Sequence, residues 1–217
     1  MNPQDYDAWY DTSRGQWVGQ TELALIQRML ALRAGEQVLD VGCGTGWFTR
    51  RLCAQTGCSI TGLDNDFSWL AWARSRAPAD GTPHWLVADA QALPFADRHF
   101  DCAAAITSLC FVHDWRRALA EMARVSRRRI ALGLLNRHSL LWRDKGRYGG
   151  LGAYHGAHWH TVKEITRALS LLPVHNLQWR TAVFLPSGRP MARLAETLLP
   201  TRLPLGSFLA VTADLAD

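Results

Sequence analysis

Residues 38–52, VLDVGCGTGWFTRRL, join an apolar run of strand length directly to a helical segment through three glycines. Gly42, Gly44 and Gly46 allow the backbone to turn sharply at this junction and to approach a ligand closely. The free N–H groups at the start of the following helix favour anionic groups. The segment therefore predicts a ligand site where a strand passes into a helix.

The same alternation of strand-type and helix-type segments continues along the chain, and it predicts an α/β fold with a doubly wound, mostly parallel seven-stranded sheet in three layers. Such sheets bind ligands at the carboxyl ends of their strands. Gly35 is expected to end the first helix, Thr161-x-x-Glu164 has the spacing of a capping box, and Arg127-Arg128-Arg129 is expected in a solvated turn. The strands are expected over 37–42, 58–64, 84–89, 100–107, 129–135, 174–185 and 207–214, and the helices over 20–33, 46–55, 66–76, 115–125, 161–171 and 188–199.

The spacing of the glycines separates two classes of cofactor. A dinucleotide fold requires G-x-G-x-x-G, whereas here the third glycine comes one residue earlier and Trp47 follows it. Asp40 precedes the first glycine, and a carboxylate there would repel a pyrophosphate. It would suit a ligand that carries an ammonium or sulfonium group.

The glycine loop and four further segments each resemble a signature of one protein family. DVGCGTG resembles motif I of the class I S-adenosylmethionine-dependent methyltransferases, in the small-molecule (type 11, quinone-biosynthesis-like) branch. ITGLDND, VADAQALPF and FDCAAAITSLCFVHDWRRALAEMARV resemble the later signatures of the family, in order and at strand ends. YDAWYDTSRG is similar to the N-terminal cap of that branch, so the resemblance covers roughly residues 5–135.

The resemblance implies a Rossmann-like methyltransferase fold with S-adenosyl-L-methionine as cofactor and S-adenosyl-L-homocysteine as product. It implies that Asp64 bonds the ribose hydroxyls, that Asp89 reaches the adenine amino group, and that Tyr6 and Trp9 fold over the cofactor. The full implied cofactor set is Tyr6, Trp9, Asp40, Gly42, Cys43, Gly44, Gly46, Asp64, Asn65, Asp89, Ala90 and Thr107.

The sequence constrains the binding site for the methyl acceptor less than it constrains the cofactor site. Thr107-Ser108-Leu109-Cys110 lacks both prolines of the N/D-P-P-Y/F tetrad found in methyltransferases that act on DNA bases. His113 has two interpretations: a base or substrate contact, or a residue before a helix that Asp114 caps. Residues 136–160 are expected to form a substrate or lid loop, and the competing interpretation is a solvated mobile loop. The substrate residues expected in it are Tyr154, His155 and His158.

YHGAHWHT, residues 154–161, raises the question of a metal site. His155 and His158 show no carboxylate or cysteine partner in the sequence, so no metal is expected, and His160 is expected to be structural or exposed. The five cysteines form no C-x-x-C pair and are expected to be reduced and mostly buried.

The length of 217 residues predicts one methyltransferase domain over 1–217, with an N-terminal cap and helix over 1–34. No segment has the length and apolarity of a membrane span, and the start of the chain does not resemble a signal peptide, so a cytoplasmic location is expected. Residues 1–112 carry 8 Lys and Arg against 12 Asp and Glu, whereas 113–217 carry 16 against 7.

The expected function is methyl transfer to a small-molecule substrate, without nucleic acid as a partner. The basic second half keeps an RNA or protein methyltransferase open. Two further functions stay open: a non-catalytic S-adenosylmethionine-binding protein and a nicotinamide oxidoreductase, which the glycine spacing disfavours.

Overall fold

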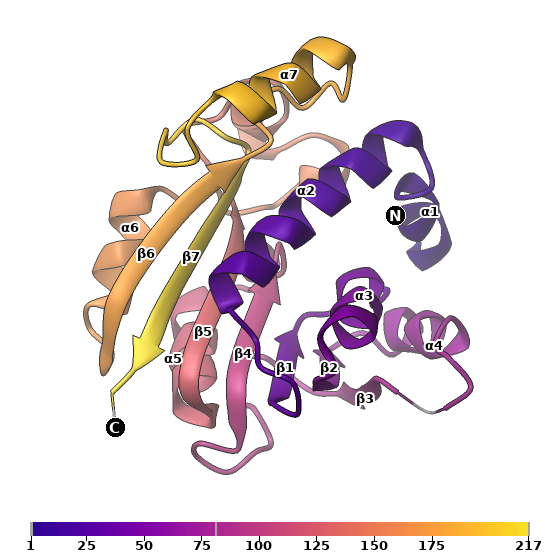
Figure 1. The fold of residues 1–217 in the computed structure, drawn as a ribbon, viewed down its shortest axis with the longest axis vertical. Helices are drawn as coiled ribbons and strands as arrows, with labels where there is room; N and C mark the ends of the chain where they lie inside the picture. Colours follow the sequence, from indigo (N-terminus) through magenta and orange to yellow (C-terminus); the bar gives the residue numbers. More distant parts are fainter. Residues whose placement is uncertain (1, 81, 217) are drawn as a thin grey trace.

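A seven-stranded sheet forms the centre of the molecule in the computed structural model, which describes residues 2–80 and 82–216. Its order is β3-β2-β1-β4-β5-β7-β6, and only β7 runs antiparallel to its neighbours (Figure 1). This sheet confirms the expected doubly wound α/β fold. The strands are β1 (Gln37–Val41), β2 (Ser59–Asp64), β3 (His84–Val87), β4 (Phe100–Ile106), β5 (Ser126–Leu135), β6 (Val174–Ala182) and β7 (Phe208–Leu215).

Helices cover both faces of the sheet and give the expected three layers (Figure 1). The buried side chains of α2 and α3 belong to one apolar core, and those of α5 and α6 belong to the core on the other face. The helices are α1 (Pro3–Trp9), α2 (Ser13–Leu30), α3 (Trp47–Thr56), α4 (Phe67–Ser75), α5 (Trp115–Val125), α6 (Val162–Leu169) and α7 (Pro190–Leu198), with short turns η1 (Leu109–Phe111), η2 (Trp142–Gly146), η3 (Arg147–Gly149) and η4 (Gly152–Tyr154).

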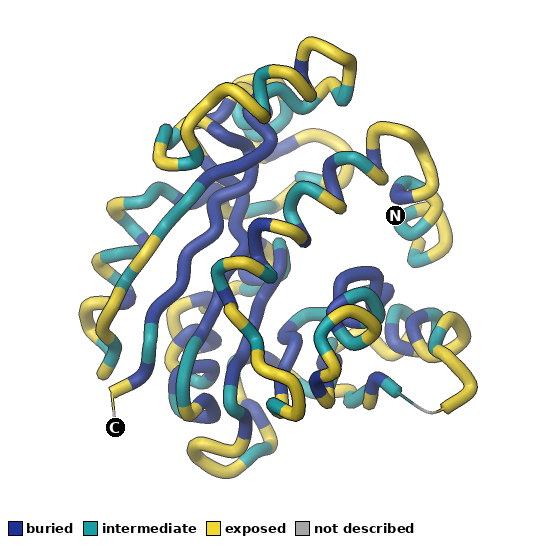
Figure 2. The backbone as a smooth tube through the Cα atoms, viewed as in Figure 1, coloured by how far each residue is buried: buried dark blue, intermediate teal, exposed yellow. Residues whose placement is uncertain are grey.

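Burial follows the position of each strand in the sheet. The central strands β4, β5 and β7 are dark blue over most of their length in Figure 2, whereas β6 at the edge is largely half-buried or exposed. Strands covered on both faces require near-continuous apolar sequence. The run FDCAAAIT in β4 was therefore a reliable signal for a central strand.

The first long helix differs from its predicted bounds of 20–33. It starts at Ser13, where the side chain of Thr12 accepts a hydrogen bond from the N–H of Gly15, and it ends at Leu30. Ala31 takes the left-handed conformation that closes the helix, so the prediction that Gly35 ends it is wrong. Glycines weaken a helix, but Gly19 fits here because a side chain would meet the rings of Tyr10 and Trp47.

The arginine run does not form a solvated turn. Strand β5 begins at Ser126, directly after α5, so Arg127–Arg129 lie within it. Arg128 forms an ion pair with Glu36 at 2.7 Å, and Arg129 forms one with Asp214 at 2.6 Å. These two carboxylates, distant in sequence, allow arginines to occupy a strand in the middle of the sheet.

Residues 136–160 form a long connection whose two ends meet. Asn136 and His160 form an isolated β-bridge, the N–H of Arg137 donates to the carbonyl of His160 at 2.9 Å, and the N–H of His160 donates to the carbonyl of Leu135 at 2.8 Å. The hydroxyl of Thr161 then caps α6 by accepting from the N–H of Glu164, as the spacing predicted. Among the described residues, no helix is both long and apolar enough to cross a membrane.

Candidate functional site

The glycine loop after β1 is held by its neighbours on both sides. The N–H groups of Gly42 and Cys43 donate to the carbonyl of Leu63 at 2.7 and 2.9 Å. Gly42 has a φ of +70°, and a Cβ there would lie 2.3 Å from the Cβ of Ser108. Only glycine fits this close approach between the ends of β1 and β4.

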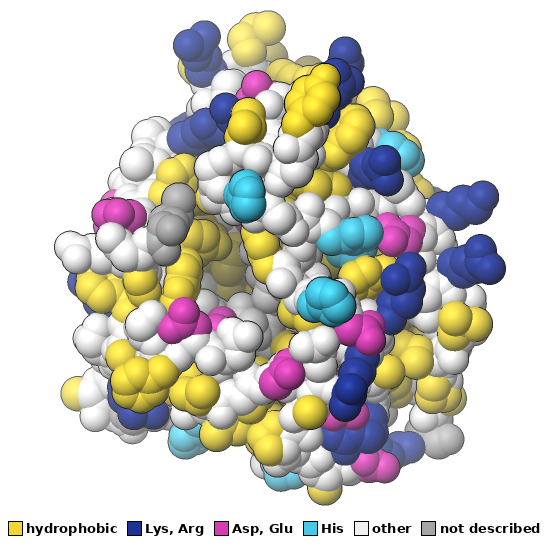
Figure 3. Space-filling view, turned by 180° about the vertical axis from the view of Figure 1, so that it is seen from behind, with side chains coloured by type: hydrophobic (Ala, Val, Ile, Leu, Met, Phe, Trp, Pro, Cys, Tyr) yellow, Lys and Arg dark blue, Asp and Glu magenta, His cyan; other side chains and the backbone are white. Residues whose placement is uncertain are grey.

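A cavity of about 740 Å³ opens at the carboxyl ends of β1, β2, β3 and β4. Figure 3 shows a hollow on this side of the molecule, with hydrophobic side chains inside it and acidic ones beside it. The volume is that of a typical small-molecule site. The predicted site residues that line the cavity are Tyr6, Gly42, Cys43, Gly44, Asp64, Asn65, Asp89, Ala90, Thr107, His113 and His155.

Two carboxylates stand at the ends of neighbouring strands in this cavity. Asp64 ends β2 and accepts a hydrogen bond from the N–H of Gly44 at 2.8 Å, which fixes the carboxylate against the glycine loop. Asp89 follows β3, and its hydrogen bond from the N–H of Gln91 at 2.8 Å helps hold its pKa below the usual range. Asp89 is therefore ionised and ready to accept from a ligand near neutral pH.

Three predicted cofactor residues lie outside the cavity lining. Asp40 is 2% exposed and accepts from the hydroxyl of Thr49 at 2.6 Å, and burial raises its pKa to about 6. Gly46 begins α3 behind the loop, and Trp9 packs against Tyr10 with ring centroids 4.9 Å apart. In this structure Asp40, Gly46 and Trp9 therefore lie behind the residues that line the cavity.

Cys43 lines the cavity, but its thiol is not activated. Burial raises its pKa well above the ordinary value, which keeps the thiol protonated. All five cysteines are free, and Cys58, Cys102 and Cys110 are buried, as expected.

An aromatic wall on the other side of the cavity was not predicted as a unit. Tyr6 contacts Trp69 edge to face at 5.1 Å, and Tyr10 stacks on Trp47 at 4.3 Å. With Phe48, all of these residues line the cavity. They come from α1, α3 and α4, so no pattern within one sequence segment could reveal that they meet.

Glu22 in α2 is a second group that the sequence did not single out. Burial raises the pKa of its carboxyl to about 8, and the carboxyl interacts electrostatically with Tyr6, Tyr10 and Tyr154. Two of these tyrosines line the cavity, so Glu22 lies close behind its aromatic wall. Its neighbours in sequence give no sign of this burial.

Residues of η1 and η4, and residues next to these turns, also line the cavity. His113 is exposed in the cavity, and the adjacent Asp114 caps α5 by accepting from the N–H of Arg117 at 3.1 Å. His113 therefore faces the cavity, while Asp114 caps α5. In the long connection, Gly152, Ala153 and His155 line the cavity.

The remaining predicted substrate residues lie elsewhere. Tyr154 is half-buried against Trp159 at 5.5 Å, and burial raises the pKa of its hydroxyl to about 12. The ring of His158 contacts Glu164 instead of the cavity, and the N–H of His158 donates to the carbonyl of Cys110 at 2.7 Å. His160, expected to be structural or exposed, is completely buried.

The residues at the cavity fit a nucleoside-bearing cofactor. The absence of side chains at Gly42 and Gly44 allows close approach to the loop backbone, and the Asp64 and Asp89 carboxylates offer hydrogen-bond acceptors at the ends of adjacent strands. The aromatic wall provides an apolar surface against which a flat or apolar group can pack.

The family model described as a methyltransferase domain matches residues 39–129, which carry the glycine loop and both carboxylates. A solved structure from Thermotoga maritima, an S-adenosylmethionine-dependent methyltransferase described as a possible histamine N-methyltransferase, has the same fold. It aligns with a TM-score of 0.78 at 22% identity, over 98% of this chain and 95% of that one. Residues 39–129 of the chain are thus similar to a methyltransferase domain.

Curated relatives resemble about half of this chain. An O-methyltransferase of Penicillium expansum is 39% identical over 55% of this chain and 45% of its own length. A demethylmenaquinone methyltransferase of Tropheryma whipplei is 39% identical over 45% of this chain and 40% of its own length. The chain thus spans less than half the length of these relatives, and the similarity to them does not extend over the whole of either protein.

Proposed function

We propose that this protein transfers a methyl group from S-adenosylmethionine to a small-molecule acceptor. The observation that carries the proposal is the Asp64 carboxylate, fixed by the N–H of Gly44 at the mouth of the glycine loop and facing the cavity. A carboxylate there accepts hydrogen bonds from ribose hydroxyls, while the glycine spacing and Asp40 before the first glycine favour this cofactor over a dinucleotide.

The cofactor, when bound, supplies a methyl group that its sulfonium already activates for displacement. The chain then has to position the reactants and exclude water, which can supply about 7–11 kcal/mol of the barrier reduction. Asp64 accepts from the ribose hydroxyls and Asp89 from the adenine amino group. Gly42 and Gly44 let the backbone approach, while Tyr6 covers the cofactor on the solvent side.

For the acceptor, the proposal uses the two histidines that line the cavity. His113 follows β4 and η1, whereas His155 follows η4. The two histidines therefore come from separate segments that line the same cavity. His113 is the candidate general base, and a base is needed only where the acceptor must lose a proton. Tyr154 and His158 act through the shape of residues 136–160, which form the acceptor loop.

Small-molecule acceptors are supported by the relatives, whose names describe O-methylation and demethylmenaquinone methylation. Nucleic acid is left out of the proposal because Arg128 and Arg129 of the basic half are paired with carboxylates within the fold. The proposal includes a cytoplasmic location and a single domain over 1–217, which the five free cysteines and the continuous sheet support.

The test is titration calorimetry with S-adenosylmethionine, S-adenosylhomocysteine and NAD. We expect the first two to bind and NAD to give no heat. Asp64→Asn retains an acceptor for the N–H of Gly44 but loses the charge, and we expect it to lose about 1.5–3 kcal/mol of cofactor binding. Asp80→Asn, at an exposed turn away from the cavity, is the matched control. Binding of NAD, or equal cofactor affinity in wild type and Asp64→Asn, would refute the proposal.

A further inference from the structure

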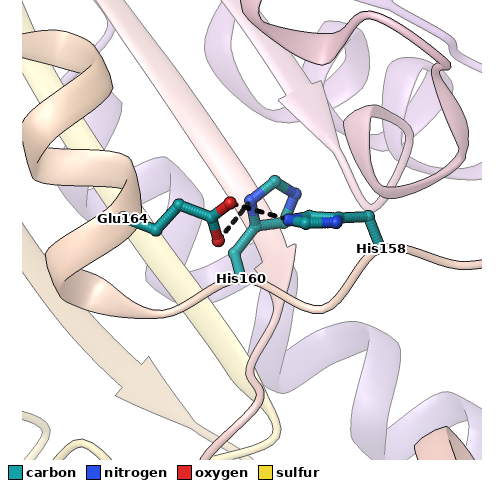
Figure 4. A group of neighbouring side chains, drawn as sticks. All are labelled: His158, His160 and Glu164. Carbon is teal, nitrogen blue, oxygen red and sulfur yellow. Dashed lines mark hydrogen bonds and ion pairs between the residues drawn. The ribbon is translucent and has the colours of Figure 1, made fainter.

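His158, His160 and Glu164 bring three potential metal-binding side chains together beside the acceptor loop (Figure 4). The two histidines flank the buried Trp159 in the stretch before α6, and Glu164 is in the first turn of that helix. One ring nitrogen of each histidine and one carboxylate oxygen all lie within 4.8 Å of one another. The sequence showed no carboxylate partner for these histidines because the N-cap turn at Thr161 is what brings Glu164 back toward them.

The separations are close to those that a single ion imposes. His158 Nε2 lies 2.9 Å from Glu164 Oε1, and His160 Nδ1 lies 3.8 Å from Glu164 Oε2. A tetrahedral ion with bonds of about 2.1 Å spaces its ligand atoms by about 3.4 Å. The two measured separations, each to a different oxygen of Glu164, lie on either side of this value.

His160 provides the second, independent observation. Its side chain is completely buried, and neither Nδ1 nor Nε2 has a hydrogen-bond partner among the described residues. A buried polar atom without a partner is costly, and native proteins usually supply one. The Glu164 carboxylate, at 3.8 Å, is too distant to be a hydrogen-bond partner for Nδ1 of His160. An ion between Nδ1 and the carboxylate would be bound by both of these groups.

The surroundings hold the cluster in place. Trp115 packs edge to face on His160 at 4.9 Å and stacks on His158 at 5.9 Å. Arg116 lies 3.7 Å from Glu164 and its guanidinium lies 4.2 Å from the ring centroid of Trp115, but its side chain is 63% exposed and can turn into solvent when a cation binds. The Glu164 carboxylate would then bind the metal ion in place of the Arg116 guanidinium.

We propose that His158, His160 and Glu164 form a binding site for a divalent transition-metal ion of the zinc class. Two imidazoles and one carboxylate are a ligand set typical of such ions, with the remaining coordination positions taken by water. The ion ties the last residues of the acceptor loop to α6, three residues beyond the cavity-lining His155. The inference is independent of the proposed methyl transfer, because metal binding is measured without any other ligand.

The test uses the full chain without an affinity tag, dialysed against chelator and then titrated with Zn²⁺. We expect one ion per chain and a higher midpoint of thermal unfolding in its presence. His158→Ala and Glu164→Gln should each weaken zinc binding on the order of tenfold or more. Both side chains are partly accessible, so circular dichroism is expected to show a folded chain in each variant.

His138→Ala, an exposed histidine at the other end of the same loop, is the matched control and should bind as wild type does. Substitution with Co²⁺ should give visible absorption without the near-ultraviolet band that thiolate ligands add. Absence of stoichiometric zinc binding, undiminished binding in His158→Ala and Glu164→Gln, or a thiolate band from the cysteines would overturn the proposal.

Discussion

At the scale of single residues, the site depends on places where a side chain cannot be present. Gly46 has a φ of +71°, and a Cβ there would lie 2.3 Å from the ring of Trp85. Gly35 has a φ of +85°, but nothing lies within 4 Å of its Cβ position. The two glycines share the backbone conformation and differ in the space around them.

Gly46→Ala should therefore destabilise the fold more than Gly35→Ala. Both variants incur the strain of a left-handed conformation, about 1–2 kcal/mol. Only Gly46→Ala also forces the ring of Trp85 to move, which adds about 1–3 kcal/mol. Chemical denaturation of the two variants measures the difference, and equal losses would mean that the contact with Trp85 does not matter.

The carboxyl of Glu22 gives the protein a pH-dependent stability. Its pKa rises from 4.5 to about 8 on folding because the carboxyl is buried. Between those two pH values the folded chain keeps a proton that the unfolded chain releases, so the free energy of unfolding falls as the pH rises. Asp40 acts in the same direction, but only up to its pKa of about 6.

The window from pH 6.5 to 8 isolates Glu22. His160, whose pKa burial lowers to about 3, titrates in the unfolded chain near 6.5 and contributes little above it. Urea unfolding across this window should show stability decreasing in wild type and a much flatter profile in Glu22→Gln. An identical slope in both proteins would show that the carboxyl of Glu22 is already ionised in the folded state.

At the scale of elements, the acceptor loop combines two duties. Gly152, Ala153 and His155 in its middle line the cavity, and its end at His158 is fixed to α6 through Glu164. The sequence alone groups His155 and His158 as one substrate pair. The structure separates them, since only His155 lies at the cavity.

His155→Ala should lower methyl transfer without changing cofactor affinity. Loss of one polar contact to the acceptor corresponds to about 1–3 kcal/mol in kcat/KM. Release of S-adenosylhomocysteine in an acceptor screen measures turnover, and calorimetry measures the cofactor. His138→Ala in the same loop is the control, and a parallel fall in cofactor affinity would point to a disturbed fold instead.

Strands β1, β4 and β7 were predictable because each is a largely buried, mainly apolar run. Asp64 and Asp89 were expected at the cofactor from the family resemblance, and both line the cavity at the ends of adjacent parallel strands. The first helix was misplaced because Gly15 and Gly19 look like helix breakers until their close packing is known. The partnership of Glu164 with His158, like the aromatic wall, depends on contacts that no local pattern records.

At the scale of the whole molecule, two arginines of β5 connect distant parts of the chain. Arg129 donates to the carboxylate of Asp214 in β7 and to the carbonyl of Met29 at 3.0 Å near the end of α2. Arg128 reaches Glu36 before β1. The excess of basic residues in the second half is thus partly balanced by acids from elsewhere in the fold.

Arg129→Gln should destabilise the protein by about 2 kcal/mol, because the carboxylate of Asp214 loses its charged partner. Arg127→Gln in the same strand is the matched control. Its side chain is 46% exposed and lies 3.7 Å from Asp101, so we expect a loss below about 1 kcal/mol. Thermal unfolding of both variants measures the two losses of stability. Equal losses would mean that the Arg129–Asp214 pair stabilises the fold no more than an ordinary surface pair.

The bridge between Asn136 and His160 has a practical consequence for protein engineering. Because the two ends of residues 136–160 meet at one bridge, the exposed part of this connection is the part to vary, whereas Leu141 and Trp159 belong to the core. Closure of a loop of different length changes the free energy only slowly with the number of residues. Loop grafting, with a library of inserts between the two fixed ends, would therefore test whether this connection sets the proposed choice of acceptor.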